Sequence, residues 1–241
     1  MKILAFDSSG LVASVAIVQD DNLIAEYTTN YKKTHSQTLL PMLDEIVEMT
    51  ETDKESFDAL AVAAGPGSFT GLRIGSATVK GLAFAWNIPV IAVPTLEGLA
   101  YNVWGTDRLI CPIMDARRKQ VYTGLYRFGS DDSLETIMDQ TPMDIADLID
   151  QLNEREEKVI FVGDGIDVYA DVIKEKMTAD YAFAPAHMNK QRAGSVAAAA
   201  QVRYAFGQYE EGDTFAPEYL RQSQAERERA EKTKLENDGH E

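Results

Sequence analysis

Short apolar segments separated by polar turns fill the first third of the chain. Ile3–Phe6 is continuously apolar, which is typical of a central strand. Small and branched residues alternate over Val12–Val18, and Leu23–Tyr27 returns after a tight reversal at residues 20–22. In a dinucleotide-binding domain a helix follows the first strand at once. This opening, with its turn at Asp7, instead predicts hairpins.

Two helices follow, and their apolar patterns differ. The first is predicted over Ser36–Met49, with Ser36 placed to cap it and Pro41 inside it. Its apolar residues cover about half of the helical circumference, which is wider than the stripe needed to pack on one core. The second helix follows a strand at Leu60–Ala64 and continues to Trp86. Its small residues recur every four positions and therefore share one face.

The surplus apolar surface of these helices predicts a binding surface for another protein chain, because contiguous exposed apolar patches mark association sites. We expect a homodimer through this surface when the chain is alone, and a different partner on the same surface in the functional assembly. The competing interpretation places both helices in the core of the first lobe. The expected interface residues are Leu39, Met42, Leu43, Ile46, Arg73, Ala77, Gly81 and Ala85.

The pattern restarts near Gly105, again with strands first and helices after, which predicts a duplicated α/β architecture. We expect one lobe over residues 1–105, a second over 106–221 and a charged tail over 222–241. The predicted strands of the second half are Leu109–Met114, Lys119–Phe128, Leu134–Asp139 and Val159–Val162. The predicted helices are Pro142–Leu152, a helix from the 163–165 turn to Lys176, and Gln191–Phe206.

Charge and cysteine content narrow the classes of function. The 241 residues carry a formal net charge of −16, which disfavours strong direct binding of tRNA or DNA by this chain alone. The single cysteine, Cys111, excludes an internal disulfide framework, and its apolar surroundings favour a buried, inert thiol over a nucleophile. No apolar run approaches the roughly 20 residues of a membrane span. The N-terminus lacks a secretory signal pattern, so we expect a cytoplasmic protein.

A glycine-rich turn opens the second helix. Gly65, Gly67 and Gly71 follow a strand, the position at which backbone N–H groups can cradle an anion. The spacing matches neither the dinucleotide motif nor the P-loop. The alternative interpretation is a tight turn that lets the helix pack closely.

Two acidic turns are candidates for a phosphate and magnesium site, since carboxylates at strand ends hold hydrated cations. Their residues are Asp7, Ser8 and Ser9 in the first half, and Gly163, Asp164 and Gly165 in the second. In a two-lobed fold these turns would face each other across a cleft; alternatively, both are ordinary capped turns. His35 is expected to be a capping or interface residue, and Asp115 to Arg118 a solvated rim with salt bridges.

Four segments together resemble the TsaB (YeaZ) family, and the resemblance covers the chain to about Arg221. They are Ile3 to Ser9, His35-Ser36-Gln37 before Leu39-Leu40-Pro41, the run GPGSFTGLRIG from Gly65 to Gly75, and Pro217 to Arg221. The resemblance implies two actin-like, ribonuclease H-like α/β lobes, each a mixed sheet with flanking helices. It also implies a role in making threonylcarbamoyladenosine beside the anticodon of tRNA.

The resemblance further implies a non-catalytic scaffold. The related catalytic subunit, TsaD, binds a metal with two histidines four residues apart, and Thr95 and Leu99 stand at the matching positions here. Neither can replace an imidazole as a metal ligand. The expected partners are a TsaD-like catalytic subunit and a TsaE-like ATPase, with tRNA met only through the complex, no metal, and ATP used by the complex. The alternative is an ATP-binding or ATP-hydrolysing enzyme that uses Asp7 and Asp164.

Overall fold

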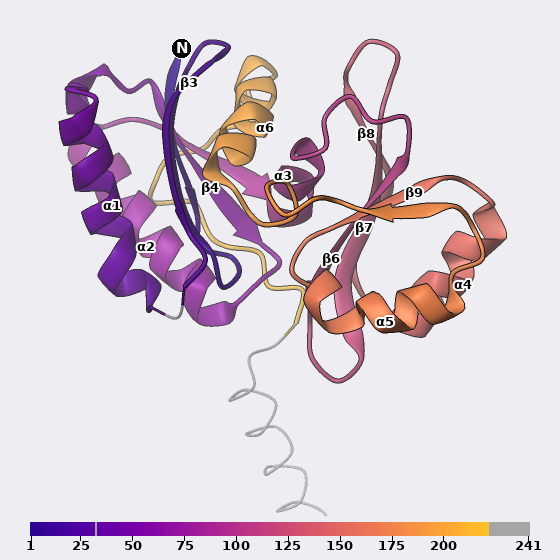
Figure 1. The fold of residues 1–241 in the computed structure, drawn as a ribbon. Helices are drawn as coiled ribbons and strands as arrows, with labels where there is room; N and C mark the ends of the chain where they lie inside the picture. The colour runs from indigo at the N-terminus through magenta and orange to yellow at the C-terminus, as the bar shows by residue number, and fades with distance from the viewer. Residues whose placement is uncertain (32, 222–241) are drawn as a thin grey trace, which may run out of the picture.

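The computed structural model describes residues 1–31 and 33–221, and shows two α/β lobes side by side (Figure 1). The predicted tail over 222–241 lies outside the described residues. The first sheet contains β1 (Lys2–Asp7), β2 (Ala13–Gln19), β3 (Asn22–Thr29), β4 (Ala59–Gly65) and β5 (Val90–Pro94). The second contains β6 (Leu109–Asp115), β7 (Gln120–Phe128), β8 (Leu134–Asp144), β9 (Val159–Val162) and β10 (Tyr181–Phe183). The helices are α1 (His35–Met49), α2 (Phe69–Trp86), α3 (Thr95–Tyr101), α4 (Ile145–Arg155), α5 (Ile166–Lys176) and α6 (Ala193–Ala205), with a short 3-10 turn at Lys54–Ser56.

The two sheets repeat one topology. The orders are β3-β2-β1-β4-β5 and, read from the other edge, β8-β7-β6-β9-β10. In each sheet the first three strands form an antiparallel meander, and the last two run parallel to the first. Parallel neighbours need a crossover connection, and α1, α2, α4 and α5 lie in the four connections. The predicted pair of actin-like lobes is therefore confirmed.

Helices cover both faces of the first sheet. The buried face of α1 packs with α2 on one side, around Leu4, Phe6 and Leu60. On the other side the small residues of α6, such as Ala193 and Ala197, pack against Ile3 and Ala5. Figure 1 shows α6 and α3 between the two sheets, with α4 and α5 on the far side of the second sheet. The central strands of each sheet are thus buried between helices, whereas the edge strands β3 and β8 are partly exposed.

The domain boundary predicted at residues 105 and 106 needs one correction. Helix α6 follows the second lobe in the chain but packs on β1, β2 and α3 of the first. Phe215, further along, is 1% exposed and belongs to the core of the first lobe beside Val79 and Val90. Helix α6 and Phe215 therefore pack with the first lobe and not with the second, to which they were assigned. Alanine-rich sequence alone does not show which sheet a helix covers.

Local differences from the prediction have identifiable causes. The helix expected from Pro142 begins at Ile145, because residues 142–144 stay paired with β7 and the Asp144 carboxylate accepts a hydrogen bond from Ala146 N at 2.9 Å. Thr34, not Ser36, is the N-cap residue of α1. The short strand β10 and the 3-10 turn were not predicted.

Candidate functional site

The predicted interface separates into a buried half and an exposed half. Leu39, Met42, Leu43 and Ile46 of α1 are only 1–5% exposed and lie in the core of the first lobe. Their assignment to a partner surface is wrong for the single chain, because the wide apolar stripe of α1 packs on both the sheet and α2. For α1, the competing core interpretation is the correct one.

Helix α2, by contrast, exposes its small residues. Arg73, Ala77, Gly81 and Ala85 are exposed, and the Phe84 side chain beside them is 91% exposed. We call these five residues the α2 face. A Cβ atom built at Gly81 would have no heavy atom within 4 Å. The side of α2 that carries Leu72, Val79 and Ala83 packs inward, so the α2 face is open surface on a folded lobe.

The turn after β1 is held tightly. Asp7 is 2% exposed, and its Oδ1 accepts hydrogen bonds from Ser9 N at 2.9 Å and Ser9 Oγ at 2.7 Å. Ser8 Oγ donates to Gly71 O at 2.9 Å. Burial raises the pKa of Asp7 to about 6, the Ser9 hydrogen bonds lower it, and the negative charge of Asp164 raises it further.

The second acidic turn lies across the cleft from the first, as the two-lobed arrangement predicts. Burial raises the pKa of Asp164, while the positive charge of Lys190 lowers it. Gly163 and Gly165 lie against the carbonyl of Ile113, and Gly165 N donates to it at 2.9 Å. The structure brings the two predicted turns to one cavity, which Ser9 of the first turn and Asp164 of the second both line.

The glycines of the 65–75 run make close packing possible. A Cβ atom at Gly67 would overlap the backbone oxygen of Ser9, and one at Gly71 would overlap that of Ser8. Ser68 N donates to Ser9 O at 2.6 Å, so this N–H group is already bonded within the protein. Ser68 Oγ accepts from Gly71 N at 3.3 Å and caps α2. The tight-turn interpretation is thus confirmed.

A cavity of about 570 Å³ lies between the lobes, next to these turns. Ser9, Gly67 and Phe69 from the first lobe and Asp115, Arg117 and Asp164 from the second are among its lining residues, and residues 218–221 line it as well.

Residues 217–221 connect the two lobes, a role that sequence reasoning missed. Glu218 N donates to Ala64 O at 2.7 Å, and the Glu218 carboxylate accepts from Gln140 Nε2 at 2.8 Å. Arg221 Nη1 donates to Ala116 O at 2.9 Å. We call residues 217–221 the strap. The amino-acid composition of the strap does not indicate that it connects the lobes; only its position in the fold does.

The positions that match the TsaD histidines have structural roles. Thr95 is 1% exposed, and its Oγ1 accepts a hydrogen bond from Gly65 N at 3.1 Å. Leu99 is also 1% exposed and packs between the lobes with Met114 and Tyr126. Glu97, between them on α3, pairs with Arg203. Within residues 1–31 and 33–221, no group of three or more His, Cys, Asp or Glu side chains could hold a metal ion.

Cys111 and His35 are both held in contacts within the fold. Cys111 is fully buried, which raises the pKa of its thiol to about 12. The expected inert thiol is confirmed. His35, the first residue of α1, lies 2.9 Å from the carbonyl oxygen of Gly10 through Nε2, a contact within the first lobe.

Known proteins show where this sequence and fold belong. A family model described as "TsaD: tRNA N6-adenosine threonylcarbamoyltransferase" matches residues 22–229. The Bacillus subtilis protein named "tRNA threonylcarbamoyladenosine biosynthesis protein TsaB" is 34% identical over 226 residues, which cover 94% of this chain and 96% of that protein. The chain belongs to the TsaB family. An Escherichia coli protein named TsaB is 38% identical over 130 residues, 53% of this chain and 55% of its own length.

A solved structure agrees with membership of the TsaB family. "YeaZ from Pseudomonas aeruginosa" is 26% identical, with a TM-score of 0.75 over 91% of this chain and 99% of that one. In the described part of the chain, no helix is long and apolar enough to cross a membrane.

We expect Asp7→Asn to stabilise the protein above pH 6. The folded protein holds the Asp7 proton with a pKa of about 6 against an ordinary value of 3.8, so wild-type stability should fall as the pH rises from about 4 to above 6. Asparagine keeps an oxygen for the Ser9 bonds and carries no charge. The free energy of unfolding in urea should be roughly 1–3 kcal/mol higher for the variant at pH 8 and similar at pH 4. Asp150→Asn, an exposed carboxylate on α4, is the control; equal stability of Asp7→Asn and wild type at pH 8 would contradict the expectation.

Proposed function

We propose that this TsaB-family chain is a non-catalytic subunit of a complex that adds a threonylcarbamoyl group to N6 of the adenosine 3′ to the anticodon, in tRNAs that read codons beginning with A. The relatives' names supply the pathway. The observation that carries the subunit role is the α2 face, an open helical surface with small residues and an exposed Phe84. Such a surface suits another helix, because small side chains let two backbones approach closely.

In this proposal the α2 face binds a TsaD-like catalytic subunit, and in isolation a second copy of the chain. A TsaE-like ATPase joins the complex at another surface. In this proposal the chain is not the catalytic subunit. Thr95 and Leu99 stand in place of the metal-binding histidines, both are buried in the fold, and neither is a metal ligand. The chain would bind no metal or ATP tightly by itself and would meet tRNA only in the complex, in the cytoplasm.

A second candidate function is ATP binding or hydrolysis by this chain. The cavity lined by Asp164 and by Ser9 of the Asp7 turn favours it, because carboxylates at strand ends could hold a hydrated magnesium ion beside phosphates. Against it, the Ser68 N–H group at the start of α2 is already bonded to Ser9 O. Residues 218–221 of the strap also line the same cavity.

Reconstitution separates the two functions. We expect the purified chain to hydrolyse ATP at the background rate, and threonylcarbamoylation of a tRNA transcript to require this chain together with the catalytic subunit and the ATPase. Each mixture that lacks one protein is the control. Turnover of ATP by the chain alone that Asp7→Ala abolishes would favour the enzyme. Full tRNA modification without this chain would contradict the subunit role.

A further inference from the structure

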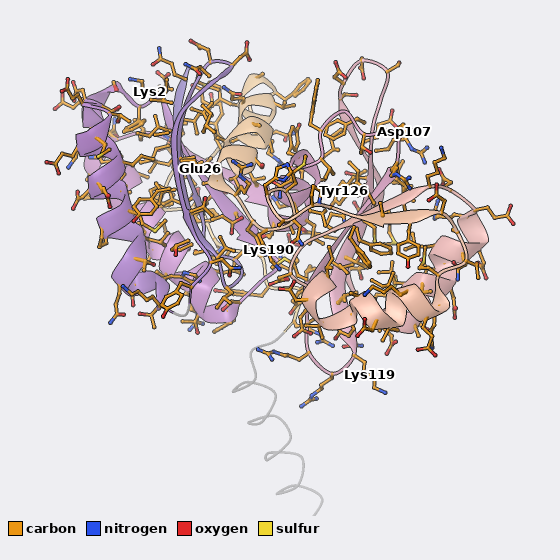
Figure 2. The ribbon with its side chains drawn as sticks, viewed as in Figure 1. Lys2, Glu26, Asp107, Lys119, Tyr126 and Lys190 are labelled. Atoms are coloured by element: carbon orange, nitrogen blue, oxygen red, sulfur yellow. The ribbon has the colours of Figure 1, made fainter. Side chains whose placement is uncertain are left out.

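The turn between β6 and β7 carries Arg117, Arg118 and Lys119, the only run of three basic residues in a chain of net charge −16. We call these three residues the basic tip. All three are exposed, and Figure 2 shows Lys119 at the lower edge of the second lobe, away from the sheets. Within the described residues, Arg118 and Lys119 have no ion pair and no side-chain hydrogen bond. Arg117 is 88% exposed and lies 3.7 Å from one carboxylate oxygen of Asp115. Positive charge therefore points into solvent from an acidic body.

The backbone of the basic tip is unusual. Arg117, Arg118 and Lys119 have φ angles of 66°, 56° and 62°, three successive left-handed residues without a glycine. Each such residue is disfavoured sterically, so the surrounding structure has to hold the conformation. A flexible loop that merely solvates its charges has no need of this conformation.

Hydrogen bonds around the basic tip hold it. Ala116 N donates to Gln120 O at 2.9 Å, and Gln120 N donates to Arg117 O at 3.1 Å. Ile145 N, at the start of α4, donates to Lys119 O at 3.0 Å. Arg221 of the strap donates to Ala116 O, which ties the turn to the first lobe as well. The basic tip is thus presented rigidly.

The position of the basic tip connects it with the α2 face. Arg117, Arg221 and Phe69 line one cavity, and the Arg73 guanidinium lies 4.0 Å from the centre of the Phe69 ring. The cavity is thus lined by Arg117 of the basic tip and by Phe69, which contacts Arg73 of the α2 face. Two of the three acidic residues that line the same cavity are engaged: Asp115 accepts from Tyr169 OH, and Glu218 accepts from Gln140. The third, Asp164, is partly buried, and its Oδ1 has no hydrogen-bond partner among the described residues.

We propose that the basic tip contacts the phosphate backbone of a tRNA. In this proposal the tRNA is held by a catalytic partner, and that partner is bound to the α2 face. This inference rests on the proposed function. Lysine and arginine bind RNA mainly through phosphates, and such contacts position the nucleic acid without reading its sequence. The acidic body repels RNA elsewhere, so the basic tip adds affinity only when a partner supplies the main binding surface.

The test uses the reconstituted complex and the double variant Arg118→Asn with Lys119→Asn. Asparagine tolerates the left-handed conformation, so the variant should fold. Lys174→Asn with Lys176→Asn, two exposed positions on α5, removes the same charge elsewhere and is the matched control. We would measure tRNA binding by anisotropy at several salt concentrations, and capture of the catalytic partner by size-exclusion chromatography.

We expect the tip variant to bind tRNA roughly 10-fold more weakly near 150 mM salt, and the slope of log affinity against log salt to fall by about 1.4–1.8 for two lost phosphate contacts. Capture of the partner and the control variant should match wild type. An unchanged slope, or an equal loss in the control variant, would overturn the proposal. Loss of partner capture would make the basic tip a protein contact, which also overturns it. If the wild-type complex binds tRNA no better than the catalytic partner alone, this inference fails while the proposed function stands. If the wild-type chain does not capture the catalytic partner, the proposed function fails, and this inference with it.

Discussion

Gly71→Ala is expected to destabilise the protein by roughly 2–4 kcal/mol, whereas Gly81→Ala on the same helix should stabilise it by roughly 0.5–1 kcal/mol. Both glycines lie in α2, and each substitution adds one methyl group. At Gly71 the new Cβ would overlap the backbone oxygen of Ser8, directly after β1. At Gly81 it would meet nothing within 4 Å. The difference in free energy therefore reports packing, since the intrinsic helix preference of alanine favours both variants.

The residues that contact Gly71 cannot shift without the loss of other interactions. Ser8 follows the central strand β1, which pairs with β2 on one side and β4 on the other. The Ser8 hydroxyl also donates to Gly71 O, so a shift of α2 would break this bond as well. Thermal unfolding of the two variants beside wild type measures the effect. We expect the melting temperature of Gly71→Ala to fall by roughly 5–15 °C and that of Gly81→Ala to rise slightly. Equal melting temperatures would show that α2 does not pack on the β1 turn in this way.

The strands and helices of this fold could be predicted from local patterns with few errors. Ile3–Phe6 and Val159–Val162 are continuous apolar runs with turns at both ends, and the structure has strands at both places. The helix start at Pro142 was wrong because β8 continues to Asp144, and the pairing of 142–144 with β7 depends on residues about twenty positions away. Local sequence does not report such a partner.

Only part of the candidate site could be predicted from the sequence. The placement of the Asp7 and Asp164 turns at one cleft could be predicted from the two-lobed architecture, in which strand ends of both lobes face the cleft. The two turns are not equivalent, because Asp7 ends β1 and Asp164 follows β9, the counterpart of β4. The burial of Leu39 and Ile46 could not be inferred from the width of the apolar stripe, because a helix that contacts a sheet and a second helix also needs a wide stripe. The strap was missed because only the tertiary structure places Glu218 beside both Ala64 and Gln140.

The partner surface is tested most directly at Gly81. Gly81→Arg is expected to leave the fold intact while weakening both the homodimer and the complex with a TsaD-like subunit at least 100-fold, a loss of roughly 3 kcal/mol or more. The space around Gly81 is open, so an arginine side chain can extend into solvent on the single chain. At the centre of a helix-to-helix contact, the same side chain would separate the two backbones and bury an unpaired charge. Both effects act only on the assembly.

Val168→Arg is the matched control for this experiment. Val168 is 56% exposed on α5 of the second lobe, so the variant carries the same new side chain on a helix away from the α2 face. Circular dichroism should show native helix content for both variants. Light scattering and co-purification with the catalytic subunit should show loss of assembly for Gly81→Arg alone. A folded Gly81→Arg protein that still dimerises and still captures its partner would place the interface on another surface, because no close helical contact centred on Gly81 could accept that side chain. An unfolded Gly81→Arg protein would contradict the structure at α2, since a Cβ atom at Gly81 has no heavy atom within 4 Å and points into open space.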